Sequence, residues 1–146
     1  MGPETIHRRR WLILGIMSLS LVITLLNNVT VNVALPELSK ELGADNTELQ
    51  GIMDAYVIVF GGLLLVMGAF GDRFGRKHAL LVGLAIVGLV SALTAQYATT
   101  SEQVIGARGL MGLGAALVMP ATLSVIVVVF PPEERGKAVG VWVGMA

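Results

Sequence analysis

Four long apolar runs, separated by short polar stretches, dominate the sequence. They cover residues 11–35, 50–70, 79–98 and 104–130. About 20 apolar residues in a helix cross the roughly 30 Å hydrocarbon core of a bilayer, so each run is long enough to be a transmembrane helix. The connections between the runs are short, which makes neighbouring helices antiparallel. The pattern predicts an all-α, polytopic membrane protein.

A fifth apolar run begins at Ala138 and continues for nine residues, to Ala146. A helix of that length reaches only about 13 Å, which is too short to cross a bilayer. We therefore expect four transmembrane helices plus the start of a fifth, and we expect the chain to be the front piece of a longer protein. In this interpretation residues 1–10 form a cytoplasmic N-terminal segment and residues 11–146 form an incomplete membrane domain.

Local signals mark the ends of the predicted helices. A short amphipathic continuation of the first helix is expected to end at Gly43. Two capping boxes are predicted, one at residues 47–50 before the second helix and one at residues 100–103 before the fourth. The consecutive prolines at 131–132 stop the fourth helix, because proline lacks an N–H and restricts the residue before it.

Composition agrees with a membrane protein. Hydrophobic residues make up 55% of the chain and charged residues 14%, whereas a typical soluble domain is about a quarter charged. The formal net charge is zero, so the overall charge does not point to a nucleic-acid partner. There is no cysteine, which excludes disulfides and cysteine-based metal sites.

Lys and Arg residues are unevenly distributed between the two sides of the predicted membrane domain. If the N-terminus is cytoplasmic, the inner segments carry eight of them and the outer loops carry Lys40 alone. The positive-inside rule therefore predicts a multi-pass protein of the cell membrane with its N-terminus inside. The basic start at residues 7–10 is not read as a signal peptide, because the apolar run after it is too long and no small-residue cleavage site follows.

The turn between the second and third apolar runs is dense in charges and glycines. Residues 68–77 resemble G-x-L-a-D-r-x-G-r-k, the signature of the loop between helices 2 and 3 in the major facilitator superfamily, although Phe70 and Gly71 depart from it. The matching residues are Gly68, Asp72, Arg73, Gly75, Arg76 and Lys77. The resemblance implies a conformational gating loop that locks the second helix against a helix of the transporter's second half. The alternative is a charged turn that only anchors the topology.

Polar side chains gather in the first apolar run. Asn28 and Asn32 are four residues apart and share a helix face. Amides in hydrocarbon need partners, so this face should look into the bundle, either to form interhelical hydrogen bonds or to line a wet cavity. Residues 26–36 also resemble the L-D-x-T-v-v-N-v-A-L-P signature of the fourteen-helix drug:proton antiporter branch. Asn27 stands where that signature has its acid and Val29 where it has Thr, so this position lacks the titratable group.

Two charged residues fall inside predicted spans. Asp54 lies about one turn into the second helix. It either favours the helix N-terminus and faces outer water, or serves as a protonatable acid at the mouth of a pathway. Arg108 lies about 7 Å into the fourth helix, where it either snorkels to the outer surface or takes part in proton coupling.

The fourth run also carries a family resemblance. Residues 108–116 are similar to the motif R-x-x-q-G-x-g-a-A, with Met111 in place of the usual Gln. The resemblance associates the arginine with proton transfer. Gly112 and Gly114 match the motif and suit close helix packing. Pro120, further along, either kinks the helix or simply packs.

The sequence contains no nucleophile–base arrangement, phosphate-binding loop or metal-ligand spacing. We therefore expect no enzyme activity, no cofactor and no metal. The resemblance implies a transporter that exports drugs or small metabolites by alternating access, driven by protons. Its expected partners are the lipid bilayer, the small-molecule substrate, protons and the missing C-terminal helices. The alternatives are a truncated, non-transporting membrane fragment, a membrane subunit that only associates with partners, and a self-assembling four-helix exporter.

Overall fold

The computed structural model describes residues 3–145, apart from the side chains of Pro3 and His7. Within this range every element is a helix. The helices are α1 (Pro3–Arg8), α2 (Arg10–Leu42), α3 (Asn46–Phe74), α4 (Arg76–Tyr97), α5 (Ser101–Val129) and α6 (Pro132–Gly144). Four of them, α2 to α5, are long and apolar enough to cross a membrane. The predicted all-α membrane fold with four candidate spans is confirmed.

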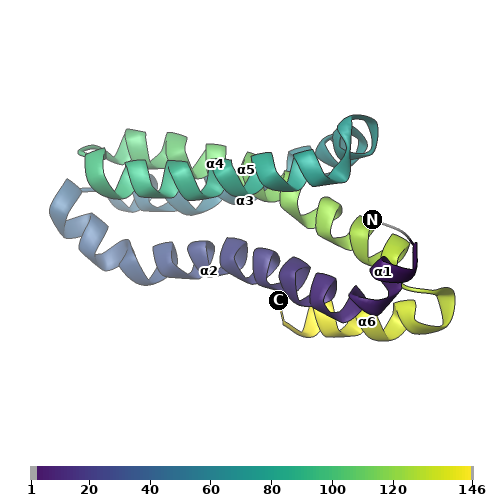
Figure 1. Ribbon diagram of the computed structural model, residues 1–146. Helices are drawn as coiled ribbons and strands as arrows, with labels where there is room; N and C mark the ends of the chain where they lie inside the picture. Colours follow the sequence, from purple (N-terminus) through teal and green to yellow (C-terminus); the bar gives the residue numbers. More distant parts are fainter. Residues whose placement is uncertain (1–2, 146) are drawn as a thin grey trace.

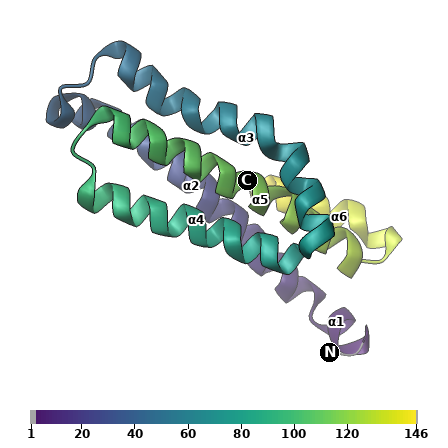
Figure 2. The ribbon, with the colours of Figure 1, turned by 90° about the horizontal axis from the view of Figure 1, so that it is seen from above.

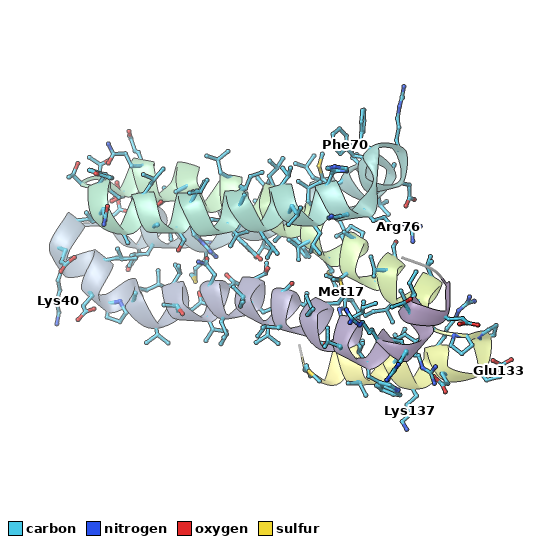
Figure 3. The ribbon with its side chains drawn as sticks, viewed as in Figure 1. Met17, Lys40, Phe70, Arg76, Glu133 and Lys137 are labelled. Atoms are coloured by element: carbon cyan, nitrogen blue, oxygen red, sulfur yellow. The ribbon has the colours of Figure 1, made fainter. Side chains whose placement is uncertain are left out.

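Helix α5 lies at the centre of an elongated bundle. Seen from above, α5 runs between α3 and α4, with α2 behind them (Figure 2). The N-terminal half of α2 lies beside the short helix α6 (Figure 1). Charged side chains mark both ends of the bundle, with Lys40 at one end and Arg76, Glu133 and Lys137 at the other (Figure 3).

Close backbone approaches at glycine join α5 to its neighbours. A Cβ added to Gly112 would lie 2.6 Å from the Tyr56 carbonyl oxygen on α3. Gly83 on α4 and Gly114 on α5 face each other in the same way, since a Cβ on either would lie within 2.8 Å of the other's carbonyl oxygen. Burial of apolar surface does not drive helices together in lipid, so these small residues allow the close packing that holds α3, α4 and α5 together.

Two predicted helix starts are partly wrong. The capping box before α3 begins at Asp45, whose side chain accepts from the Glu48 N–H at 2.8 Å, while the Glu48 side chain accepts from the Asp45 N–H at 2.9 Å. Thr47 instead lies inside α3, because Asp45 supplies a capping oxygen and also has a glutamate three residues later. Thr100 caps α5 as predicted, but the Gln103 side chain reaches back to the residue before the cap.

The charged turn is much shorter than predicted. Helix α3 continues to Phe74 and α4 begins at Arg76, so Gly75 alone separates them. Gly75 has φ +100°, which a residue with a Cβ rarely adopts. Most of residues 68–77 are therefore helical. At the end of α2, Gly43 adopts the left-handed conformation with φ +64°, as the sequence predicted.

Candidate functional site

Arg108 is almost completely enclosed inside the bundle. It lies on α5 about 10 Å from the start of that helix, and 1% of its surface is exposed. Its Nε donates to the Ile52 carbonyl at 3.1 Å, its Nη2 donates to Asn28 Oδ1, and its guanidinium stacks over the Tyr56 ring at 4.4 Å. The side chain therefore does not snorkel to the surface, and all three partners are uncharged.

The helix packing explains how a backbone carbonyl reaches this guanidinium. Gly112 follows Arg108 by one turn of α5, and Tyr56 follows Ile52 by one turn of α3. The close approach of Gly112 to the Tyr56 carbonyl brings the two backbones together at that turn. One turn away, the same approach leaves the Ile52 carbonyl within hydrogen-bonding distance of Arg108. A carbonyl has two lone pairs, so it can bind Arg108 in addition to a partner in its own helix.

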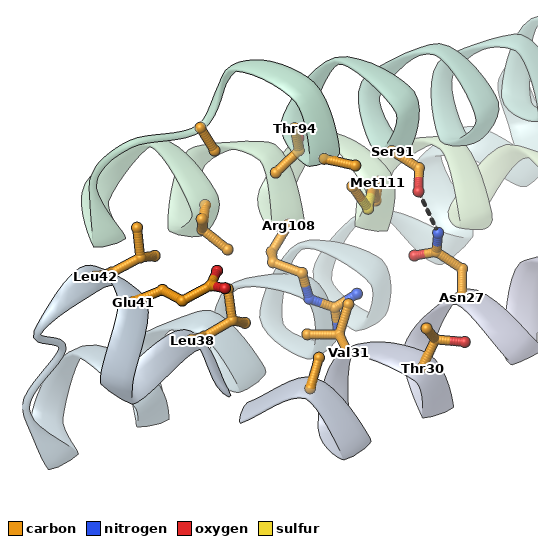
Figure 4. Close-up of a pocket in the computed structure, with 14 residues that line it drawn as sticks. Asn27, Thr30, Val31, Leu38, Glu41, Leu42, Ser91, Thr94, Arg108 and Met111 are labelled. Atoms are coloured by element: carbon orange, nitrogen blue, oxygen red, sulfur yellow. Dashed lines mark hydrogen bonds between the residues drawn. The ribbon is translucent and has the colours of Figure 1, made fainter. Parts of the chain in front are cut away.

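A cavity of about 450 Å³ adjoins Arg108 between α2, α4 and α5. Figure 4 shows the guanidinium reaching into it from α5, with polar residues of α2 and α4 around it. The polar residues that line it are Asn27, Thr30, Glu41, Ser91, Thr94 and Arg108. Asn27 Nδ2 donates to Ser91 Oγ at 2.9 Å and so connects α2 to α4 across the cavity wall (Figure 4). The space is large enough for a small organic ligand.

The three asparagines predicted to act together have different surroundings. Asn28 binds Arg108, and Asn27 both lines the cavity and forms an interhelical hydrogen bond. Asn32 is exposed, so the structure does not place it in the site. Asn27 thus both forms an interhelical hydrogen bond and lines the cavity, the two roles given as alternatives for the face of Asn28 and Asn32.

Asp54 does not meet Arg108. It is exposed on α3, and the ion pairs between residues 3 and 145 do not include it or Arg108. It also lies about two turns into the helix instead of the expected one, because α3 begins at Asn46. The structure therefore does not place these two charged residues in an ion pair.

At the opposite end of the bundle, Arg76 ties the α3–α4 turn to α5. Its Nη2 lies 3.1 Å from Asp72 Oδ1, and its Nη1 donates to the Ser124 carbonyl at 2.8 Å. Arg73 and Lys77 are exposed. Asp72 thus has a partner one helical turn away, within the turn itself.

Gly68 and Pro120 form a contact between α3 and α5 near this turn. A Cβ added to Gly68 would lie 3.6 Å from Pro120 Cβ, which is ordinary van der Waals contact. Pro120 is inside α5. The contact supports the packing interpretation of Pro120 and does not test the kink.

Several residues of the site were not predicted. Tyr56, Ser91 and Glu41 contact or surround the Arg108 cavity, and Ile52 contributes only its backbone. Ser91 could have been noticed, because it is a hydroxyl near the middle of an apolar run. The ion pair between Arg10 and Glu134, at 2.9 Å, joins α2 to α6 and was also missed. No sequence signal pairs residues so far apart.

Comparisons with known proteins agree with this fold. Residues 17–146 match the family described as the Major Facilitator Superfamily. The chain is 42% identical over 135 residues to the methyl viologen resistance protein SmvA of Salmonella typhimurium, 36% identical over 135 residues to the multidrug efflux pump LfrA of Mycolicibacterium smegmatis, and 39% identical over 142 residues to the puromycin resistance protein pur8 of Streptomyces alboniger. These matches cover 92%, 92% and 97% of the chain but 27% of each relative. The chain therefore belongs to the Major Facilitator Superfamily and spans about a quarter of the length of these relatives.

Proposed function

We propose that the chain is the first part of a proton-coupled exporter of drugs or small metabolites, which works by alternating access in the plasma membrane. The family and the resistance and efflux names of three relatives support export of small molecules. In this proposal the protein is not an enzyme, needs no cofactor, and acts together with helices beyond this chain. The helices that are absent supply the second half against which this part moves.

The observation that carries the proposal is the enclosed charge of Arg108. An ionisable group inside a transmembrane segment is costly, and such groups mark ion, proton or substrate pathways. Guanidinium does not deprotonate in proteins, so Arg108 provides a fixed positive charge beside the cavity. A fixed charge of this kind favours proton release from acids that approach it during the transport cycle. Asn27 carries no proton at the family's acid position, so we assign the proton-carrying role to acids such as Asp54 or to groups outside this chain.

The gating role is assigned to the turn around Gly75. Arg76 holds the α3–α4 turn against α5 through Ser124. The Asp72 side chain is 61% exposed and uses Oδ1 for Arg76. Asp72 is thus accessible to a further helix, which would compete for the carboxylate and release or lock the turn. This exchange of partners would distinguish one access state from the other.

Transport by the full-length protein that contains these residues tests the assignment. Arg108→Ala should abolish efflux driven by a pH gradient while the protein still inserts in the membrane. Asp54→Asn should reduce efflux less, because Asp54 is exposed and does not line the cavity. Lys40→Gln removes an exposed positive charge from the end of α2 and serves as the matched control. Unchanged gradient-dependent efflux in Arg108→Ala would remove the arginine from the mechanism.

Topology can be tested with single cysteines, because the chain contains none. Thr47 and Phe74 are exposed at opposite ends of α3. With a cytoplasmic N-terminus, an impermeant maleimide applied to intact cells should label Thr47→Cys and leave Phe74→Cys unlabelled until the cells are opened. The reverse pattern would invert the proposed orientation.

The 146 residues by themselves should not transport. Reconstituted in proteoliposomes under a proton gradient, the chain should take up no lipophilic cation beyond empty vesicles, because one part of a rocking pair has no opposing gate. Gradient-dependent uptake would instead favour a self-assembling exporter.

A further inference from the structure

Within residues 3–145, Arg108 has no counter-ion among its contacts. Its partners are an amide oxygen, a backbone carbonyl and an aromatic ring. Between residues 3 and 145, no carboxylate oxygen lies within 4.0 Å of it. Its Nη1 is also buried and donates to no protein group in the described part of the chain. A buried N–H without an acceptor is costly, and a buried charge without a counter-charge is more so.

The cavity beside Arg108 offers space for a counter-charge near the guanidinium. It extends along α2 from Asn27 to Leu42 and is closed on the other sides by α4 and α5. Apart from Arg108, the one charged residue that lines it is Glu41, which is exposed at the end of α2 (Figure 4). The hydroxyls of Thr30 and Thr94 are neutral, and each donates its proton to a carbonyl of its own helix.

The walls suit a ligand with an apolar part. Val31, Ala34 and Leu38 of α2 line the cavity between its polar end and its mouth, opposite Ala95 and Met111. A guanidinium forms strong, charge-assisted hydrogen bonds with a carboxylate. The polar end thus recognises a carboxylate and the apolar stretch recognises a short hydrocarbon chain.

We propose that the cavity between α2, α4 and α5 binds a small amphiphilic carboxylate, whose anionic group lies beside the guanidinium of Arg108 and whose apolar part lies along Val31, Ala34 and Leu38. The site is separate from the smaller cavity of about 200 Å³ that Tyr56, Phe60 and Trp142 line elsewhere in the bundle. The proposal concerns binding and does not require that the protein transport the ligand or couple to protons.

Equilibrium dialysis of the purified full-length protein with radiolabelled octanoate tests the site without any gradient. Wild-type protein should bind octanoate saturably, with one ligand per protein above the detergent-only control. Octylammonium should not compete, because its charge is of the wrong sign. Arg108→Gln should weaken binding by at least about tenfold, since a charged hydrogen bond is lost. Lys40→Gln, which removes an exposed positive charge at the same end of the bundle, should bind as wild type.

A second pair of variants keeps Arg108 in place. Ala34→Phe should fill the cavity and prevent binding, whereas Val33→Phe, at a neighbouring position that is 76% exposed, should not. Absence of saturable octanoate binding to the wild type would overturn the proposal. It would also be overturned if Arg108→Gln and Ala34→Phe both bound octanoate as tightly as the wild type. Binding that appears only in Glu41→Gln would also overturn it, because Glu41 and not a ligand would then be the counter-ion.

Discussion

Arg108 is a charged group buried inside the bundle, whereas Asp72 and Arg76 form a charged pair at its exposed end. Arg108 is 1% exposed and is held by neutral groups. The side chains of Arg76 and Asp72 are 35% and 61% exposed and form an ion pair one turn apart. In water an ion pair needs little support and contributes little, whereas in hydrocarbon a charge persists only where oriented dipoles surround it. The first arrangement demands accurate helix packing and the second does not.

The largest effect is expected from a variant that separates α3 from α5 and so disrupts the packing around Arg108. Gly112→Val places a side chain where a Cβ is already 2.6 Å from the Tyr56 carbonyl oxygen, so a backbone must move. We expect a loss of about 3 kcal/mol of unfolding free energy in detergent, together with loss of octanoate binding. Gly106→Ala, in the same helix but facing open space, should be neutral or slightly stabilising. Equal stability of the two variants would contradict the packing account.

The next largest effect should come from the amide that binds Arg108. Asn28→Leu removes the acceptor of Nη2 and leaves a further buried N–H unpaired. We expect a loss of about 2 kcal/mol, measured by chemical denaturation in detergent. Asn32→Leu is the matched control, since Asn32 has the same side chain one turn along α2 but is exposed. The control should change stability by less than about 0.5 kcal/mol.

A smaller effect is expected at the exposed turn. Arg76→Gln loses the hydrogen bond to Ser124 and the pair with Asp72, which should cost about 1 kcal/mol. Asp72→Asn should cost only a few tenths, because the pair is half-exposed and screened by salt. Arg73→Gln, at a neighbouring exposed position, controls for the loss of charge. Thermal unfolding in low and high salt measures all three, and a large Asp72→Asn effect would show that the pair is not screened.

The sequence predicts the spans well and the site only in part. Apolar runs determine which helices can cross the membrane. Gly43 ends a helix and Thr100 begins one through local capping interactions that the sequence reveals. The Arg108 site depends on which faces of α2, α3 and α5 meet. That choice follows from glycine contacts such as Gly112 with Tyr56, which no local pattern specifies. The helix packing therefore supplies Arg108 with the Ile52 carbonyl, a partner that no side-chain pattern in the sequence reveals.

The predicted turn between the second and third helices is too long, for a local reason. Charges and glycines favour turns, so the sequence predicts a loop at residues 71–78. Helices α3 and α4 instead run through it, since charged residues are tolerated in helix ends that reach water. Gly75, with φ +100°, changes the chain direction between the two helices, while its own N–H still donates to the Gly71 carbonyl at 3.0 Å.

The most direct test of the central claim is a double-mutant cycle between Asn28 and Arg108. Unfolding free energies of Asn28→Leu, Arg108→Met and the double variant give their coupling. If neutral groups hold the buried charge, the coupling should be at least about 1 kcal/mol and should not change between low and high salt. Additivity within about 0.5 kcal/mol, or a coupling that disappears in high salt, would show that Arg108 is not held inside the bundle as described.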